Sequence, residues 1–294
     1  MADDYIEFLK SIKPRTVYVC PYPGNAGDGL IVLGTHHLLD ELGITRTLVP
    51  AKADLILYPG GSPVLWQQDL DVWRDVWQRF PDKDFVVGPS TFQYSTLNWA
   101  DLLRNKGRTV RALFAREPVS YEILQKTSWG VAMQIGLADD PAFSLRRSEF
   151  IKELRKACTE EYSLFAFRRD HEGSADSRLF TALRSLLPSG PGYLLERIYR
   201  RRRYQEKIAA AQSRESDTHP RMVSDVASLN FDMFVQGVQR AKDVHTDRLH
   251  VMILACLLGK KVFAYGTAYR KLETVYQYSM KDWADVSFQG RGIS

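Results

Sequence analysis

The sequence predicts an α/β protein made of two successive units, each a mostly parallel sheet covered by helices on both faces. Two observations carry this prediction: short β-branched or apolar runs alternate with helical patterns, and glycine-rich turns follow several of the strands. The alternation continues less regularly after residue 147. We therefore expect domains at 1–147 and 148–294, and the cleft between two such units is the default place for a functional site.

The first unit begins with a strand at Thr16–Cys20, followed by the glycine-rich turn Gly24–Gly29 and a helix that Gly43 closes. An amphipathic helix is expected over Gln67–Phe80. The other expected strands of this unit are Arg46–Val49, Ala53–Tyr58, Asp84–Gly88, Ala112–Ala115 and Val131–Ile135.

The second unit shows the same alternation of strands and helices, and the sequence has no internal repeat. Expected helices are a linker at Ser148–Glu160, then Ser174–Leu187, a basic helix at Leu195–Ser213, Phe231–Ala241, Asp247–Leu258 and Tyr269–Ser279. Expected strands are Tyr162–Phe167, Met222–Ala227 and Lys261–Tyr265, with a turn at Gly190–Gly192.

Composition excludes several classes of protein. The chain has 294 residues, 45% hydrophobic and 26% charged, which suits a globular protein with a real core. Its 3 cysteines form no CxxC pair, so free thiols in a reducing compartment are expected. The net charge of +5 is too weak to indicate a dedicated nucleic-acid binder. With neither a membrane-spanning run nor a signal peptide, we expect a cytoplasmic protein.

The turn at Gly24–Gly29 lies between a strand and a helix, where backbone N–H groups favour anions. Its spacing matches neither GxGxxG nor a Walker A loop, so a tight turn with Asp28 capping the helix is the alternative. His36 and His37 are adjacent and point about 100° apart on a helix, which does not suit a shared metal. We expect no metal site.

Two further segments end strands of the first unit. Arg116 would emerge at the carboxyl end of the sheet, where ligands bind, or it forms a surface pair with Glu117. The carboxylates of Asp139 and Asp140 precede Pro141, and a turn is favoured over a catalytic base there.

The most informative segment is Asp243–His250, which leads into the apolar run VMILACLLG. That run is hydrophobic on nearly every side, so the helix is expected to be buried. Thr246 or Asp247 can cap it. Arg248 and His250 then lie in its first turn, at the positive end of the helix dipole. Together they suggest an anion site with a proton donor, the alternative being a capped helix with polar ends.

A basic run with interleaved aromatic residues follows Gly192. A solvated helix face, nucleic acid and an anionic surface are all open readings, and we favour anionic lipid or a lipid pyrophosphate. Tyr199 and Tyr204 would then lie at headgroup level. The cations of this run are Arg197, Arg200, Arg201, Arg202 and Arg203.

Taken together, GNAGDGLI, the Gly60–Gly61 pair, LFAREPVSYEIL, ADDPAF and HTDRLHVMILACLLGKKVFAYG occur in an order that resembles the polysaccharide pyruvyl transferase family. The resemblance runs from Tyr18 to Lys271. It implies two Rossmann-like domains facing a cleft, similar to the GT-B glycosyltransferase architecture. It departs from the family at Lys261, where proline is usual, and over 173–220, which matches no family pattern.

The resemblance also implies an activity in exopolysaccharide biosynthesis. Pyruvate would be transferred from phosphoenolpyruvate to two hydroxyls of one sugar, forming a cyclic ketal and releasing phosphate, without cofactor or metal. The family's Arg-x-His motif, which contacts phosphoenolpyruvate, matches Arg248 and His250. Its Arg-Glu motif falls on Arg116 and Glu117, and its trailing lysine on Lys271.

From these matches we expect His250 to donate the proton, and Arg248 and Arg116 to clamp the anions. Asp28 and Asp140 are candidate bases toward the sugar. The remaining candidate contacts to substrate are Asn25, Gly27 and Lys271.

The acceptor is expected to be an oligosaccharide, plausibly polyprenyl-linked. The enzyme would then work at the inner face of the inner membrane as a peripheral protein. Two other functions stay open. A GT-B glycosyltransferase would use a sugar nucleotide, but no acidic residue placed for its ribose is recognisable in the second half. A non-catalytic membrane-associated assembly protein would need no Arg-x-His motif.

Overall fold

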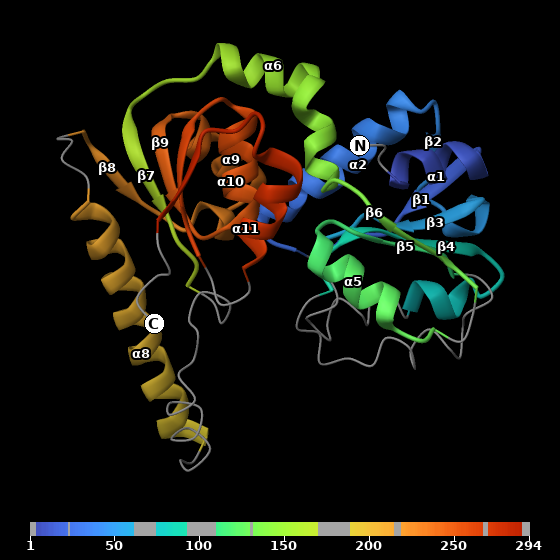
Figure 1. The fold of residues 1–294 in the computed structure, drawn as a ribbon, viewed down its shortest axis with the longest axis horizontal. Coiled ribbons are helices and arrows are strands. Elements are labelled where there is room, and N and C mark those ends of the chain that lie inside the picture. Colours follow the sequence, from blue (N-terminus) through green and yellow to red (C-terminus); the bar gives the residue numbers. More distant parts are fainter. Residues whose placement is uncertain are drawn as a thin grey trace. The chain divides into compact units, whose positions relative to one another are not determined.

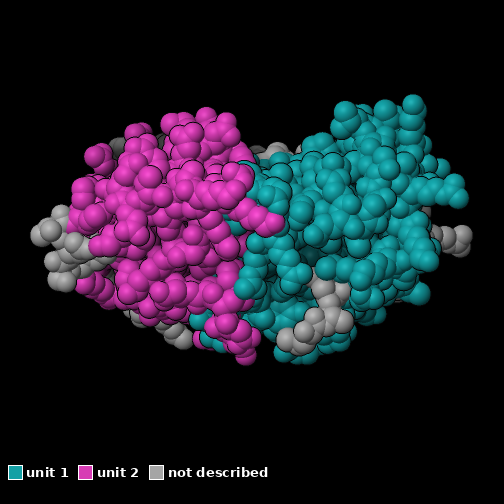
Figure 2. All heavy atoms as spheres, turned by 90° about the horizontal axis from the view of Figure 1, so that it is seen from above, with its two compact units in different colours: residues 1–151, 274–280 teal, residues 152–273, 281–294 magenta. Residues whose placement is uncertain are grey.

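The computed structural model describes residues 4–22, 24–61, 75–92, 110–129, 132–169, 189–214, 219–266 and 270–289, without the side chains of 189–196 and 200. The chain forms two compact units (Figure 2). Unit 1 comprises Met1–Ile151 and Thr274–Met280, and unit 2 comprises Lys152–Glu273 and Lys281–Ser294. The division falls just after the boundary expected at residue 147. Thr274–Met280 also belong to unit 1, which the two expected domains, with one boundary between them, did not anticipate.

Unit 1 is built on a six-stranded sheet of order β2-β1-β3-β4-β5-β6 (Figure 1). Each neighbouring pair of strands runs parallel, which confirms the expected α/β class. The strands are β1 (Thr16–Val19), β2 (Thr45–Arg46), β3 (Leu55–Tyr58), β4 (Asp84–Ser90), β5 (Val110–Ala115) and β6 (Gln134–Leu137).

Both faces of this sheet are covered. Leu55 and Leu57 of β3 join one hydrophobic cluster, whereas Ile56 and Tyr58 join another, as the alternation of a strand requires. The helices are α1 (Asp4–Ile12), α2 (Gly29–Glu41), α5 (Pro118–Lys126) and α6 (Glu149–Lys156), which runs across the boundary, with short 3-10 helices η1 (Ala26–Asp28), η2 (Pro50–Lys52) and η4 (Pro141–Arg147).

Two differences from the expected elements concern unit 1. The N-terminal helix α1 was not anticipated, and its Tyr5 packs against Phe114, with 5.1 Å between the ring centroids. The expected helix at Gln67–Phe80 lies partly outside the described residues, and 75–79 are helical. There Trp77 stacks on Phe85 at 5.5 Å.

Unit 2 is built on a five-stranded sheet of order β11-β10-β9-β7-β8, again with parallel neighbours (Figure 1). Its strands are β7 (Tyr162–Ala166), β8 (Arg221–Val223), β9 (Ala241–Thr246), β10 (Lys261–Tyr265) and β11 (Val286–Gln289). Its helices are α8 (Ser189–Gln212), α9 (Phe231–Gln239) and α10 (Leu249–Leu257), with the 3-10 helix η6 (Val226–Ser228). Helix α11 (Lys271–Val275) runs across the boundary between the units, and the π-helical turn η7 (Tyr276–Met280) that follows it belongs to unit 1.

The central strand β9 is absent from the expected elements because it carries Asp243, His245 and Thr246, which look like a loop in sequence. In the fold, each polar side chain is buried and bonded to a neighbouring strand. Asp243 accepts from the Ser163 hydroxyl at 3.2 Å, His245 Nδ1 lies 3.1 Å from the Tyr265 hydroxyl, and Thr246 donates to the Ala166 carbonyl at 2.7 Å. Pairing across the sheet thus satisfies the buried groups.

Three other elements expected in unit 2 compare with the structure as follows. The turn at Gly190–Gly192 is wrong, because these residues lie at the start of α8, where Pro191 is tolerated. The strand at Met222–Ala227 is shorter, since β8 ends at Val223 and η6 follows. The helix expected at Ser174–Leu187 lies outside the described residues.

Helix α2 and η4 are in very close contact at Gly34. A Cβ there would lie 2.0 Å from the Pro141 carbonyl oxygen, which is backbone and cannot swing away. The Ser144 hydroxyl also donates to the Gly34 carbonyl at 2.7 Å. Packing of the first helix therefore requires glycine at this position.

We expect Gly34→Ala to destabilise the protein by about 1–3 kcal/mol, because overpacking outweighs the better helix propensity of alanine. Thermal unfolding measures the change. Gly43→Asn is the control, since Gly43 has φ +68° with nothing within 4 Å of its Cβ position, and asparagine tolerates that conformation. An unchanged melting temperature for Gly34→Ala would contradict the tight contact.

Candidate active site

The strongest candidate site lies in unit 2, where β9 ends and α10 begins. Thr246 is the last residue of β9, Arg248 is the N-cap residue of α10, and His250 is its second helical residue. In open parallel sheets, ligands bind at the carboxyl ends of the strands. Both residues of the Arg-x-His motif therefore lie where the fold class puts its ligands.

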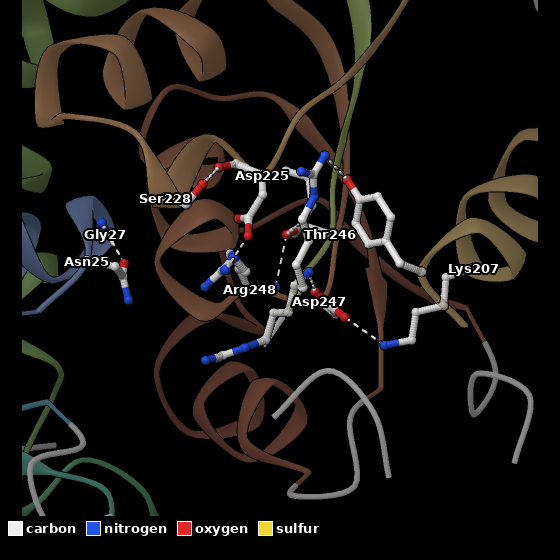
Figure 3. Close-up of polar contacts among 12 residues, drawn as sticks. Asn25, Gly27, Lys207, Asp225, Ser228, Thr246, Asp247 and Arg248 are labelled. Carbon is white, nitrogen blue, oxygen red and sulfur yellow. Dashed lines mark hydrogen bonds and ion pairs between the residues drawn. The ribbon is translucent and has the colours of Figure 1, made fainter. Parts of the chain in front are cut away.

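Arg248 is held by its backbone and by its side chain (Figure 3). Its amide donates to the Thr246 hydroxyl at 3.0 Å, and a guanidinium nitrogen donates to Asp225 Oδ2 at 2.5 Å. The Arg248 and Asp225 side chains are only 8% and 4% exposed, so this is a nearly buried ion pair. Such a pair is strongly directional because little water competes with it.

The expected capping of α10 differs in the structure. Asp247 does not cap the helix, because its carboxylate accepts from the Arg168 amide at 2.7 Å and from Lys207 Nζ at 2.9 Å (Figure 3). The N-cap residue, Arg248, gives no side-chain hydrogen bond to the helix. Asp247 instead ties the end of β7 and helix α8 to the turn before α10.

The charge pattern at this helix start favours an anion. All nine residues of α10 are buried, as the sequence predicted, and His250 is 8% exposed. Helix N-termini normally carry Ser, Thr, Asp or Asn, because the dipole is positive there. An arginine and a histidine in their place are electrostatically costly unless an anion binds.

Helix α8 carries the basic run, and its cations differ in exposure. Arg197, Arg201 and Arg202 are exposed, whereas Arg203 is partly buried. Glu206 lies 3.0 Å from Arg202 and 3.8 Å from Arg203, so part of the positive charge is balanced within the helix. The side chain of Arg200 lies outside the described ones.

Tyr204 does not fit the expectation that it lies among lipid headgroups. It packs with Ile208 against the core cluster of Phe165 and Tyr265. The Arg169 guanidinium also lies over its ring, 4.7 Å from the centroid. The part of α8 from Tyr204 onward is thus fixed to the sheet, and the part before Tyr204 carries the exposed arginines.

In unit 1, the turn at Asn25–Asp28 forms a capping box. Asn25 Oδ1 accepts from the Gly27 amide and Asp28 Oδ2 accepts from the Asn25 amide, both at 2.9 Å. A Cβ on Gly24 would lie 2.4 Å from Asp28 Oδ2. The turn reading therefore explains the local sequence, although Asn25, not Asp28, is the side chain that caps, and it caps η1.

Arg116 and Asp140 are paired with each other. Both side chains are 0% exposed, and a guanidinium nitrogen of Arg116 lies 2.6 Å from Asp140 Oδ2. Arg116 Nε also donates to Thr91 at 2.9 Å, and Asp140 Oδ1 accepts from the Ala142 amide at 3.0 Å. This network joins the ends of β4, β5 and β6. This geometry gives both side chains a structural role, and the anion clamp and base expected from the sequence stay predictions.

Arg116 directly follows β5, so it does emerge at the carboxyl end of the sheet, as one reading expected. The alternative, a surface pair with Glu117, is wrong, because both residues are buried. Glu117 caps α5 by accepting from the Ser120 amide and hydroxyl. Lys271 is the first residue of α11 and is partly buried.

Other chemistry is limited in the described part of the chain. Burial raises the pKa of the Cys20 and Cys256 thiols to about 12, which makes them poor thiolate nucleophiles. Among the residues that the structure describes, no group of three His, Cys, Asp or Glu side chains could hold a metal ion. No described helix is long and apolar enough to cross a membrane.

The family model for polysaccharide pyruvyl transferases matches residues 25–269, most of the chain. The chain belongs to the polysaccharide pyruvyl transferase family. It is therefore a transferase of polysaccharide biosynthesis, and its reaction is the transfer of pyruvate to a polysaccharide acceptor. No curated protein matches the sequence.

Solved structures show a related fold. An uncharacterized protein of Klebsiella pneumoniae aligns with a TM-score of 0.62 at 21% identity, covering 97% of both chains. UDP-GlcNAc 2-epimerase of Methanocaldococcus jannaschii, in complex with UDP-GlcNAc and UDP, gives a TM-score of 0.40 at 11% identity, covering 94% of this chain and 88% of its own. The epimerase of Neisseria meningitidis bound to UDP-GlcNAc gives 0.37 at 12% identity, covering 85% and 81%.

Sequence reasoning missed the partners of the predicted residues. Asp225 and Lys207 lie 23 and 40 residues from the groups that they contact. Nothing local marks Lys207. Asp225 had one available signal, since it follows the end of a strand, the position at which parallel sheets gather their functional side chains.

The neighbouring carboxylate Asp139 gives a prediction about pH. Burial raises its pKa, and a 2.6 Å hydrogen bond from Ser279 opposes the rise. The folded state therefore disfavours its charged form, and stability is lost as the pH rises through the folded pKa. We expect Asp139→Asn to be more stable than the native protein at pH 7, with the difference vanishing below the ordinary value of 3.8.

Thermal unfolding across this pH range measures the effect. Asp82→Asn, which changes an exposed carboxylate of the same unit, is the control variant. A variant at Asp139 that is less stable at pH 7 would mean that the bond from Ser279 outweighs desolvation.

Proposed function

We propose that this transferase uses phosphoenolpyruvate as donor and forms a cyclic pyruvate ketal on two hydroxyls of one sugar, releasing phosphate. The observation that carries the proposal is the start of α10, where Arg248 and His250 occupy the positive end of a buried helix. Phosphoenolpyruvate carries a carboxylate and a phosphate. Both groups suit a guanidinium fork beside helix amides.

The proposed reaction begins with protonation of C3 by His250, which creates an oxocarbenium-like centre at C2. One sugar hydroxyl then adds to C2, and its proton returns to the imidazole. The second hydroxyl attacks C2 as the C–O bond to phosphate breaks, and its proton leaves with the phosphate. Arg248 stabilises the anionic groups throughout.

The remaining candidates receive narrower roles. The base role expected for Asp28 is not part of this proposal, because the proposed steps pass one hydroxyl proton to His250 and the other to the phosphate. Lys271, Asn25 and the Gly27 backbone are proposed as further substrate contacts. Arg116 and Asp140 are left out, because both are fully buried in their mutual ion pair.

The direct test incubates the protein with phosphoenolpyruvate and a panel of free and lipid-linked oligosaccharides. We expect phosphate release and a glycan mass gain that matches a ketal. Phosphoenolpyruvate at ~100 times its dissociation constant should also stabilise the protein by about 2.7 kcal/mol, whereas UDP- and GDP-sugars should not. Stabilisation by a sugar nucleotide alone would support a glycosyltransferase instead.

Variants of the motif separate binding from chemistry. Arg248→Ala should weaken phosphoenolpyruvate binding by roughly 1.5–3 kcal/mol, because a charge-assisted clamp is lost. His250→Gln should lower kcat by ~10²–10⁴ while binding changes little. Arg240→Ala, which removes an exposed arginine of the same unit, is the control. Full turnover by His250→Gln across neutral pH would contradict the proton-donor role.

We further propose that the part of α8 before Tyr204 binds anionic lipid or the pyrophosphate of a polyprenyl-linked acceptor. Arg197, Arg201 and Arg202 are exposed there, and Ile198 is 55% exposed between them. Each arginine near an anionic surface contributes about 1 kcal/mol, and salt screens the attraction.

Changing Arg197, Arg201 and Arg202 to Gln should abolish salt-sensitive sedimentation with phosphatidylglycerol vesicles. A matched control changes Arg214, Arg221 and Lys261 to Gln, three exposed cations of unit 2 outside this run. Activity on a soluble acceptor should survive in both. An equal loss of vesicle binding in both variants would mean that net charge, not α8, drives the attraction.

A further inference from the structure

The Asp225 carboxylate does not cap the turn in which it lies. Asp225 occupies the N-cap position of η6, yet its side chain gives that helix no capping bond. The turn is closed by backbone groups and by Ser228, whose amide and hydroxyl both donate to the Asp225 carbonyl, at 2.9 and 2.7 Å. The carboxylate is therefore not needed to form the turn that carries it.

The contact that this carboxylate does make is with Arg248. Oδ2 accepts from a guanidinium nitrogen at 2.5 Å, and the Asp225 side chain is 4% exposed (Figure 3). Oδ1 is buried and accepts no hydrogen bond from the residues that the structure describes. A buried carboxylate oxygen without a donor is costly, and its free lone pairs allow a two-point contact with the guanidinium fork.

We infer that Asp225 is a positioning residue that sets the direction of the Arg248 guanidinium toward the donor anion. Arginine has five N–H donors in a rigid plane, so fixing one edge of the plane also fixes the others. The Thr246 hydroxyl fixes the backbone of Arg248 independently. The identity of the anion in this inference rests on the proposed function. The orientation of the guanidinium rests on the ion pair alone.

A negative charge beside an anion site also opposes anion binding, and the two effects predict opposite results. If orientation dominates, Asp225→Ala weakens phosphoenolpyruvate binding by roughly 10-fold, within the coupling range of contacting residues. Asp225→Asn keeps an acceptor for Arg248 and should restore affinity to near that of the native protein. Tighter binding by both variants would show that Asp225 acts only as a repelling charge, and would overturn the inference.

A double-mutant cycle decides whether Asp225 acts through Arg248. Asp225→Ala combined with Arg248→Ala should bind phosphoenolpyruvate no more weakly than Arg248→Ala alone, because the group to be positioned is gone. Additive losses would overturn the inference. Asp243→Asn, which alters another buried carboxylate on the same sheet with a different partner, is the control and should leave affinity unchanged.

A readout without ligand separates this inference from the proposed function. The ¹⁵N–¹H order parameter of the Arg248 side chain, assigned by its loss in Arg248→Lys, should fall in Asp225→Ala and be retained in Asp225→Asn. An unchanged order parameter overturns the positioning role. If the order parameter falls and the native protein binds no phosphoenolpyruvate, the positioning role stands and the proposed donor is wrong.

Discussion

A buried arginine at the carboxyl edge of a parallel sheet has to be paired with a carboxylate, and both units meet this constraint. Arg116 pairs with Asp140 in unit 1, and Arg248 pairs with Asp225 in unit 2. Removing one partner of such a pair leaves an uncompensated buried charge, which costs several kcal/mol. Each pair also joins chain segments that follow different strands. The loops at these edges therefore take their positions from the pairs.

The two pairs differ in what surrounds them, and this difference separates their roles. Arg116 is fully buried and donates to Thr91 as well as Asp140, so these hydrogen bonds are made to other residues of the fold. Arg248 retains a small exposed fraction and begins a buried helix. At that position the dipole, the guanidinium and His250 all favour a negative partner. The same residue type thus forms a fully buried ion pair in one unit, and in the other it is the group that we propose for anion binding.

Helix α8 is connected to this turn by a second ion pair. Lys207 contacts Asp247, the residue directly before Arg248, while Tyr204 and Ile208 pack on the sheet. The basic part of the helix before Tyr204 is therefore continuous with the part that packs on the sheet. An acceptor held on its exposed arginines would be fixed to the unit that carries the proposed donor site, which suits the proposed ketal formation, in which two hydroxyls must meet one carbon atom.

The sequence by itself determined the α/β class, the parallel sheets, the buried helix α10 and the position of Arg248 and His250. Hydrophobic periodicity, glycine-rich turns and the Arg-x-His motif are all signals that lie within short stretches of sequence. Strand β9 was not predicted from the sequence, since the hydrogen bonds that allow Asp243 and His245 to be buried come from residues of other strands. Tertiary structure alone decided that Arg116 pairs with Asp140 and Arg248 with Asp225. Partners 23 or 24 residues away meet when strands align, and no local pattern encodes that meeting.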